Sequence, residues 1–364
     1  MSILIFLIIL LVLVVSHEFG HFIVAKKSGI RVDEFSFGFP PKLFGVKKGE
    51  TSYNFNALPF GGYVKIFGEN PDEDSMNGPD KNRSFVNKPK YIQAAVLLAG
   101  VVMNFLVAWL LLSIGFMSGL PSSLGSAPAG STIQNQALTV TSVTPQSPAE
   151  VAGLKVGDKL LKLESKNSSS DTPSVESVRY FVRQNARDPI TVTFSRANST
   201  EQVVVTPKEN LVEGAPGIGI SMDIIGTLKL PVYQAVWEGL KLSSHLVVAT
   251  VTGFWDLIVG GINGTGNISS ITGPVGIVGV VGDAAEFGFI YLLSFTALIS
   301  INLAVINLIP FPALDGGRLL FLLIEKIKGS RIKPQVANVA NMIGFGLLML
   351  LMVVVTYNDI VKLL

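Results

Sequence analysis

The sequence predicts a multi-span α-helical membrane protein with about four transmembrane helices, a membrane-associated β-hairpin region and an inserted α+β domain. Three observations predict it. Of the 364 residues, 49% are hydrophobic and only 15% are charged, a balance too apolar for an ordinary soluble enzyme. Several apolar runs are long enough to cross a hydrocarbon core of ~30 Å. A long stretch between two of them returns to the composition of a soluble domain.

The charge and the cysteine content exclude several classes of function. A net charge of +2, with dispersed basic residues, does not suggest a nucleic-acid surface. We expect no nucleic-acid partner and no organic cofactor. The chain has no cysteine, so any metal ion must be held by His, Asp or Glu side chains.

Four apolar runs have the length of a transmembrane helix, namely residues 3–25, 91–117, 287–309 and 336–357. The first run differs from a signal peptide because its charges, Lys26 and Lys27, follow it rather than precede it. No small-x-small cleavage site is evident either. We therefore expect a retained helix that enters from outside.

Two segments between the runs are rich in basic residues. Residues 29–90 alternate apolar and polar side chains in places, which favours β-hairpins, and they carry many lysines. Residues 318–333 are also basic. By the positive-inside rule both segments face the cytoplasm, and the parity of four spans then places residues 121–229 outside.

The remaining boundaries follow from composition. Residues 121–229 are polar with strand-like runs, so we expect a small independent β-rich domain, with a Ser/Gly/Pro-rich linker at 121–131. Charged residues interrupt the apolar stretch 230–260, which favours an amphipathic helix at the membrane surface; a fifth span there would break the parity. The expected parts are a first membrane half, the outer domain, an amphipathic or gate segment and a second membrane half, at 1–120, 121–229, 230–286 and 287–364.

The first apolar run contains the sequence His17-Glu18-Phe19-Gly20-His21. On a helix the two histidines project from one face about 6 Å apart, which lets one metal ion take both imidazoles. Glu18 lies beside them and can accept a proton from water activated by the metal. The match could be accidental, but ionisable groups inside a transmembrane helix cost several kcal/mol and are usually functional.

A catalytic zinc ion needs a third protein ligand. His245 lies in the amphipathic segment, and Glu34, although conceivable, lies in a β-like stretch beyond the helix. A better candidate is Asp315, in the run Asn307-Leu-Ile-Pro310-Phe-Pro312-Ala-Leu-Asp315-Gly316-Gly317-Arg318. The prolines break the third span and the glycines allow a tight turn, which would present the carboxylate inside the protein.

The expected depth of the two motifs in the membrane supports a shared metal site for His21 and Asp315. His21 and Asp315 both precede basic residues closely, so both should lie near the cytoplasmic edge of the membrane. The alternative is that Asp315 merely caps the next helix, a common role for Asp.

Together these motifs resemble the site-2 protease family of intramembrane zinc metalloproteases, in its bacterial RseP-type branch. That family pairs an HExxH helix with a downstream N-x-x-P-x-P-x-L-D-G motif, and this chain matches both. The resemblance covers nearly the whole length. It implies that His17, His21 and Asp315 bind Zn2+, that Glu18 is the general base, and that Asn307 positions or stabilises the reacting peptide.

Two smaller features also match the family. Gly61 and Gly62, in Leu58-Pro-Phe-Gly61-Gly62-Tyr-Val-Lys65, resemble a membrane-associated hairpin thought to pair with an extended substrate; the alternative is an ordinary hairpin turn. Asn104 matches a recurrent asparagine of the second span, and we count it as a substrate-binding candidate; the alternative is packing between helices.

The outer insert resembles a bacterial PDZ domain. Residues 143–158 read as its strand-helix-turn run, and Gly217, Ile218, Gly219 and Ile220 as its peptide-binding loop in the permuted order. Such a groove binds an extended chain at a sheet edge; the alternative is that the domain binds nothing and acts as a steric gate. The chain has room for one PDZ-like domain, not a tandem pair. Residues 269–277 resemble a family segment before the third span and are compatible with a gate or with a loop breaker.

The function that these features imply is hydrolysis of peptide bonds within or near the transmembrane segments of single-span membrane proteins. Anti-sigma factors and signal-peptide remnants are the substrates that the resemblance suggests, in a bacterial inner membrane, with the active site near the cytoplasmic face. Two other classes are considered: a catalytically silent scaffold that recruits partners through its outer domain, and a metal transporter lined by His17, His21 and Asp315. An intact Glu18 disfavours the scaffold, and the lack of an inverted repeat disfavours the transporter.

Overall fold

The computed structural model describes residues 1–363 apart from 129–130, 167, 172, 197–198, 213–214 and 265–271. The chain forms two compact units. The first consists of Met1–Ser113, Val236–Asp283 and Leu293–Leu364, and the second of Ile114–Ala235 and Ala284–Leu292. The first unit is mainly helical and the second is mainly β-structure.

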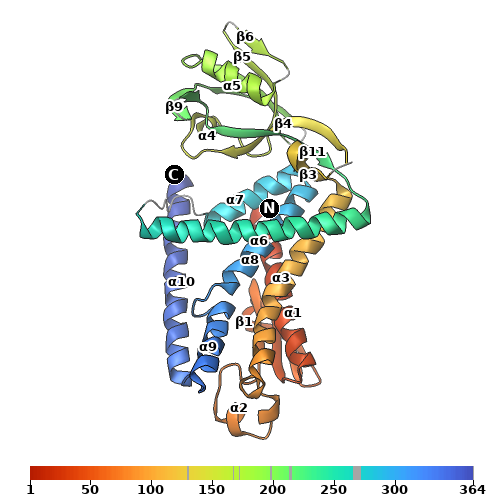
Figure 1. Cartoon of the computed structure of the whole chain (residues 1–364), viewed down its shortest axis with the longest axis vertical. Helices are drawn as coiled ribbons and strands as arrows, with labels where there is room; N and C mark the ends of the chain where they lie inside the picture. The colour runs from red at the N-terminus through yellow and green to blue at the C-terminus, as the bar shows by residue number, and fades with distance from the viewer. Residues whose placement is uncertain are drawn as a thin grey trace. The chain divides into compact units, whose positions relative to one another are not determined.

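Five helices in the described part of the chain are long and apolar enough to cross a membrane. Four of them coincide with the predicted spans: α1 (Ser2–Lys27), α3 (Lys90–Ser118), α8 (Phe289–Leu308) and α10 (Pro334–Leu363). The fifth is α6 (Val232–Ile262), where the sequence predicts an amphipathic surface helix. In Figure 1 α6 runs across α3 and α10 instead of alongside them.

The helices of the first unit pack through small and branched side chains. Ala108 and Leu112 of α3 meet Ala297 and Ile301 of α8 in a buried cluster, and α6 covers it with Leu242, Leu246, Val247 and Phe254. Alanines at such a contact let two helices approach closely, which favours their association in an apolar environment. This packing holds α8, which leads into the Asp315 turn, against α3.

Two long strands, β1 (Val32–Lys48) and β2 (Thr51–Ile66), form the hairpin region. They bend, so that residues 34–37 of β1 pair with residues 52–55 on one side and with residues 62–65 on the other. The alternative of a hairpin turn at Gly61-Gly62 is wrong, because both glycines lie within β2. Their missing side chains let β2 pack closely on α1: a Cβ at Gly61 would lie 3.2 Å from Val14 Cγ1.

A second core joins the segments that carry the two motifs. It combines side chains of α1, the hairpin, α3 and α9 (Asp315–Lys328), among them Ala25, Ile30, Val32, Ile66, Phe85, Val96 and Leu97, with Leu319 and Leu322 packed against it. Burial of each larger side chain contributes about 1.5–3 kcal/mol. The same packing therefore fixes the distance between the beginning of α9 and the histidines of α1.

Short helices complete the first unit. α2 (Glu73–Asn77) begins with a capping box at Asp72 and Ser75, and the 3-10 turns Lys81–Arg83 and Phe85–Asn87 follow it. α7 (Pro274–Phe287) begins where the sequence allows a gate or a loop breaker; Ser269, Ser270 and Ile271 of that segment lie outside the described residues. The Asp359 carboxylate accepts hydrogen bonds from the N–H groups of Gly273 and Gly276, at 3.1 and 2.8 Å, so this segment begins a helix.

The second unit is built on a twisted antiparallel sheet in the order β3-β11-β4-β5-β7-β8, with β6 paired to β5 and a separate pair β9-β10. The strands are β3 (Leu120–Ser123), β4 (Ile133–Val143), β5 (Lys159–Ser165), β6 (Ser168–Ser170), β7 (Ile190–Arg196), β8 (Ser199–Val205), β9 (Lys208–Val212), β10 (Ala215–Gly217) and β11 (Ile220–Leu228). Two helices accompany them, α4 (Pro148–Val151) and α5 (Val175–Gln184). The sequence predicts strand-like runs at residues 138–143, 190–194 and 202–206, and these fall on β4, β7 and β8, with Thr206 just beyond the end of β8.

The predicted linker begins as a strand instead. The last three residues of β3 lie within the Ser/Gly/Pro-rich stretch, and the strand pairs antiparallel with residues 225–228 of β11. The pairing partner is distant in sequence, and the local composition of residues 121–131 carries no sign of it.

A buried ion pair stabilises the second unit. Asp158 is fully buried, and its two carboxylate oxygens accept hydrogen bonds from Nε and Nη2 of Arg196, both at 2.7 Å. We expect Arg196→Ala to lower the free energy of unfolding of this unit by about 3–5 kcal/mol, because it leaves a buried carboxylate without its cation. Thermal unfolding and limited proteolysis between residues 131 and 229 would measure this, and exposed Arg187, whose change to Ala should have little effect, is the control.

Candidate active site

His17 and His21 lie one helical turn apart on the buried face of α1, and each is only 6% exposed. His21 is oriented by α3, because its Nδ1–H donates to the carbonyl oxygen of Val96 at 2.8 Å. A proton on Nδ1 leaves Nε2 as the nitrogen with a free lone pair. That nitrogen points to His17, and the two Nε2 atoms are 3.1 Å apart.

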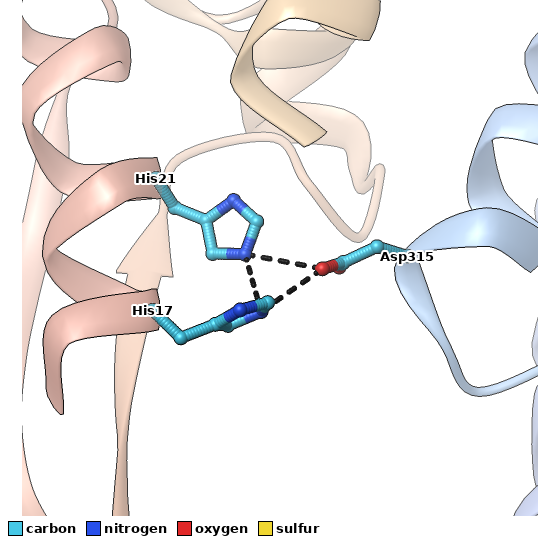
Figure 2. Close-up of side chains that lie close together, drawn as sticks. All are labelled: His17, His21 and Asp315. Atoms are coloured by element: carbon cyan, nitrogen blue, oxygen red, sulfur yellow. Dashed lines mark hydrogen bonds and ion pairs between the residues drawn. The ribbon is translucent and has the colours of Figure 1, made fainter. Parts of the chain in front are cut away.

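Asp315 approaches the histidines from the other half of the chain (Figure 2). Its Oδ2 atom lies 3.0 Å from His17 Nε2 and 3.3 Å from His21 Nε2. The helix that Asp315 begins has Leu314 at its N-cap position, with no side-chain cap. The alternative that Asp315 merely caps this helix is therefore wrong, since its side chain faces the histidines.

A metal ion fits this donor set. The ligand atoms of His17, His21 and Asp315 all lie within 4.8 Å of one another, and each can present a lone pair to the same point. Tetrahedral zinc with bonds of 2.0–2.2 Å places neighbouring donors ~3.3 Å apart, close to the separations observed. Three converging lone pairs repel one another, and a cation between them removes this cost.

Glu18 lies beside the cluster and is held by the hairpin. Its Oε2 accepts a hydrogen bond from the backbone N–H of Val64 in β2, at 3.0 Å. Residues 62–65 pair with residues 34–37 of β1, and N–H groups along such a strand point alternately toward the partner strand and away from it; the bond to Glu18 of α1 shows that the Val64 N–H points away from β1. The base candidate and the edge of this strand are therefore neighbours.

Asn104 lies behind His17 on α3. It is completely buried, and its Nδ2 atom is 3.3 Å from His17 Nδ1. Its backbone carbonyl accepts a hydrogen bond from Ser300 Oγ of α8 at 2.8 Å. The sequence predicts either substrate binding or helix packing for Asn104. In the structure Asn104 also contacts His17, a candidate metal ligand.

Gly100 is a site residue that sequence reasoning missed, although it lies four positions before Asn104 and hence on the same helix face. A Cβ atom at Gly100 would lie 2.5 Å from His21 Nε2 and 2.7 Å from His17 Nε2. Only glycine lets the α3 backbone pass this close to both imidazoles. The spacing from Asn104 is the one signal that could have identified it.

We expect Gly100→Ala to reduce zinc affinity and proteolysis by at least tenfold, because the methyl group displaces one or both imidazoles. Zinc titration and a peptide cleavage assay would measure the change. Gly253→Ala is the matched control, since nothing lies within 4 Å of a Cβ built at this position of α6. Equal losses in both variants would contradict the explanation.

The remaining candidates from the first unit are Asn307, Gly61, Gly62 and Glu34. Asn307 is half-buried in the last turn of α8, in the chain segment that leads to Asp315. Gly61 and Gly62 lie in β2 against Val14 and Val15 of α1. The Glu34 carboxylate instead accepts hydrogen bonds from Tyr63 and Asn54, at 3.0 and 3.3 Å.

The PDZ-like loop candidates lie in the second unit. Ile218 is buried in its core, and its carbonyl oxygen accepts from Ala149 N–H at 2.9 Å. Gly219 has φ +86°, and Ile220 begins β11 after Gly217 ends β10. The four residues form one continuous connection from β10 into β11.

A family model matches most of the chain. The model of peptidase family M50 covers residues 5–351. The chain belongs to peptidase family M50. A Clostridium perfringens protein described as a candidate zinc metalloprotease is 36% identical to this M50 member over 349 residues, covering 96% of this chain and 95% of that protein. The regulator of sigma-W protease RasP of Bacillus subtilis is 30% identical over 434 aligned positions, which cover 98% of each chain.

Among solved structures, a PDZ domain of an SdrC-like protein from Listeria monocytogenes matches 25% of this chain and 92% of its own, with 21% identity and a TM-score of 0.21.

Membership of family M50 confirms the predicted family, the predicted enzyme class and the predicted zinc cofactor. This M50 protein is a zinc metalloprotease. With its long apolar helices it is an integral membrane protein.

Proposed function

We propose that this M50 protein hydrolyses peptide bonds within or next to the transmembrane segments of single-span membrane proteins. The observation that carries the proposal is the cluster of His17, His21 and Asp315 with Glu18 beside it, on or next to helices apolar enough to lie in a bilayer. Ionisable groups are costly at such a depth, and a hydrolytic site for membrane-embedded chains gives them a use.

His17, His21 and Asp315 are the residues that would hold zinc, through two imidazole nitrogens and one carboxylate oxygen. Three protein ligands suit a catalytic rather than a structural zinc site, which uses four. When bound, zinc supplies Lewis-acid chemistry, in that it activates water and polarises the scissile carbonyl.

Glu18 moves the proton. Its carboxylate takes a proton from the attacking water and returns it to the nitrogen of the leaving amine, so that water is added across the C–N bond without a covalent intermediate. The hydrogen bond from Val64 N–H keeps the carboxylate oriented while it does this. Asn307, which matches the family asparagine, is assigned to position or stabilise the reacting peptide.

We assign Asn104 to the orientation of His17. A metal-binding imidazole usually donates its other N–H to an acceptor, which fixes the ring. Asn104 is the group next to His17 Nδ1, and its Oδ1 is buried with no hydrogen-bond partner among the residues described. Rotation of this amide about its terminal bond would present that oxygen to the imidazole N–H.

The substrate must be extended before it is cut, because a helix hides its peptide groups in intrachain hydrogen bonds. We propose that it adds as a strand to the edge of β2 at Gly61 and Gly62. Support comes from the position of this edge: it faces α1, and Val64 on it bonds to Glu18. A peptide paired there would run past the base.

The outer domain has two roles open to it. Gly217, Ile218, Gly219 and Ile220 lead into β11, which pairs with β4 along its length but with β3 only over residues 225–228. Residues 220–224 therefore have an edge that β3 leaves free, suited to adding a peptide strand. The alternative is that the domain acts only as a steric gate.

For the topology we propose four spans, formed by α1, α3, α8 and α10, with α6 at the membrane surface. The crosswise course of α6 in Figure 1 supports this assignment. The basic segments 29–90 and 318–333 would then face the cytoplasm, with the PDZ-like domain outside a bacterial inner membrane. Since RasP of Bacillus subtilis is named as a regulator of sigma-W, anti-sigma factors are the first substrates to test, followed by signal-peptide remnants.

The decisive experiment is to incubate the purified protein with single-span peptides, with and without a zinc chelator. We expect cleavage inside or next to the span, abolished by the chelator and restored by added zinc. Mass spectrometry of the products would locate the cut. Chelator-insensitive cleavage, or cleavage only in soluble regions, would refute the proposal.

A further inference from the structure

Helix α10 packs against the turn that leads into Asp315, which consists of residues 312–315. The Oδ1 atom of Asn341 accepts a hydrogen bond from the backbone N–H of Ala313, at 3.1 Å. Ala313 lies two residues before Asp315, and Asn341 lies in the second turn of α10. Through this hydrogen bond a polar side chain of α10 contacts the turn that leads into Asp315.

Ala313 needs such support because its backbone is strained. Its φ angle is +76°, in the left-handed region that residues with a Cβ atom rarely adopt. Without a stabilising contact, a turn of this kind tends to relax toward negative φ. A change at Ala313 would be transmitted to Asp315 through a single intervening residue, Leu314.

A second contact on the same face of α10 supports this reading. Gly344 lies three positions after Asn341, so the two residues are neighbours on the helix surface. A Cβ atom at Gly344 would lie 2.5 Å from the carbonyl oxygen of Pro312 and 2.7 Å from its Cβ. The helix backbone therefore lies directly against the turn.

The structure assigns Asn341 as a positioning residue: from α10 it holds Ala313 in the left-handed conformation that aims Asp315 at His17 and His21. The inference rests on the proposed function in that Asp315 is taken as a metal ligand. Asn341 itself touches neither metal nor substrate, and it acts only through the backbone of the turn.

The test is Asn341→Ala in the full-length protein, with zinc affinity measured by chelator competition alongside peptide cleavage. We expect both to fall by about tenfold, the lower end for residues that orient metal ligands. Asn338→Ala is the matched control, because Asn338 is an exposed asparagine one turn earlier on α10. It should bind zinc and cleave peptide as the unchanged protein does.

The second variant separates positioning from a general loss of stability. Glycine adopts positive φ without strain, so Ala313→Gly should need no help from Asn341. We expect the double variant Ala313→Gly with Asn341→Ala to recover most of the zinc affinity that Asn341→Ala alone loses. A purely structural role for Asn341 would leave the double variant as weak as the single one.

Two results would overturn the inference: unchanged zinc affinity in Asn341→Ala, or a double variant with no recovery. Neither result depends on peptide cleavage, so a failure of this inference can be told apart from a failure of the proposed function. If the proposed function is wrong, the protein without any substitution will bind zinc but cut no membrane peptide. The zinc measurements on the Asn341 variants would still decide whether Asn341 positions Asp315.

Discussion

Replacement of Glu18 by Gln should lower the rate of peptide hydrolysis by about 10²–10⁴-fold while the protein still binds zinc. Glutamine has the shape of glutamate and can still accept the hydrogen bond from Val64 N–H through its amide oxygen. It cannot take a proton from water. The substitution therefore removes the base and leaves the His17, His21 and Asp315 donors in place.

The measurement is a cleavage assay on a single-span peptide together with zinc content after dialysis. Glu34→Gln is the matched control: Glu34 is also a hairpin-region carboxylate, but its hydrogen bonds are to Tyr63 and Asn54 rather than to the cluster. It should retain activity, which would also exclude Glu34 as a ligand. If Glu18→Gln kept full cellular function, a scaffold that recruits partners through its outer domain would explain the chain better.

The features that the sequence predicted well are those encoded by local pattern. Four apolar runs of membrane-spanning length became α1, α3, α8 and α10 with nearly the expected ends. The two histidines four residues apart needed only helical geometry to share a face. Asp315 was harder, since its pairing with them depended on a depth argument, yet the prolines and glycines around it marked an irregular segment with a carboxylate inside the protein.

The features that it did not predict depend on contacts between distant segments. The pairing of β3 with β11 has no local signature, so residues 121–123 looked like the beginning of a linker. The role of Gly100 arises only because α3 passes against the α1 histidines. Asn104 was found through its resemblance to a recurrent asparagine, but its contact with His17 Nδ1 required the packed helices.

The length of α6 shows a different limit. Its charged residues, Glu238, Lys241 and Asp256, suggested a surface helix, whereas its length and overall apolar character also suit a span. Local composition does not decide between these, because helix orientation is set by packing and by the residues at the interface. Labelling of exposed cysteines introduced along α6, in membranes of known sidedness, would settle its orientation.

The second large effect is expected from Asp315→Asn. An amide oxygen is neutral and binds zinc weakly, so the variant should lose zinc affinity by more than about 100-fold, the upper end of losses seen for residues that merely support ligands. Cleavage should be lost with it. Zinc titration of the purified protein and the same peptide assay measure both effects. Asp359→Asn is the control, because Asp359 is a buried carboxylate of the first unit that accepts hydrogen bonds from Gly273 and Gly276 instead of facing the histidines.

The contrast between the two variants is more informative than either alone. Glu18→Gln should separate zinc binding from hydrolysis, whereas Asp315→Asn should remove both, as expected if Asp315 holds the metal and Glu18 moves the proton. Should Asp315→Asn bind zinc as tightly as the unchanged protein, the 3.0 Å approach of its carboxylate to His17 would have to serve another purpose. A pathway for metal ions would be supported by a different result, namely zinc flux into proteoliposomes that Asp315→Asn abolishes and Glu18→Gln leaves unaffected.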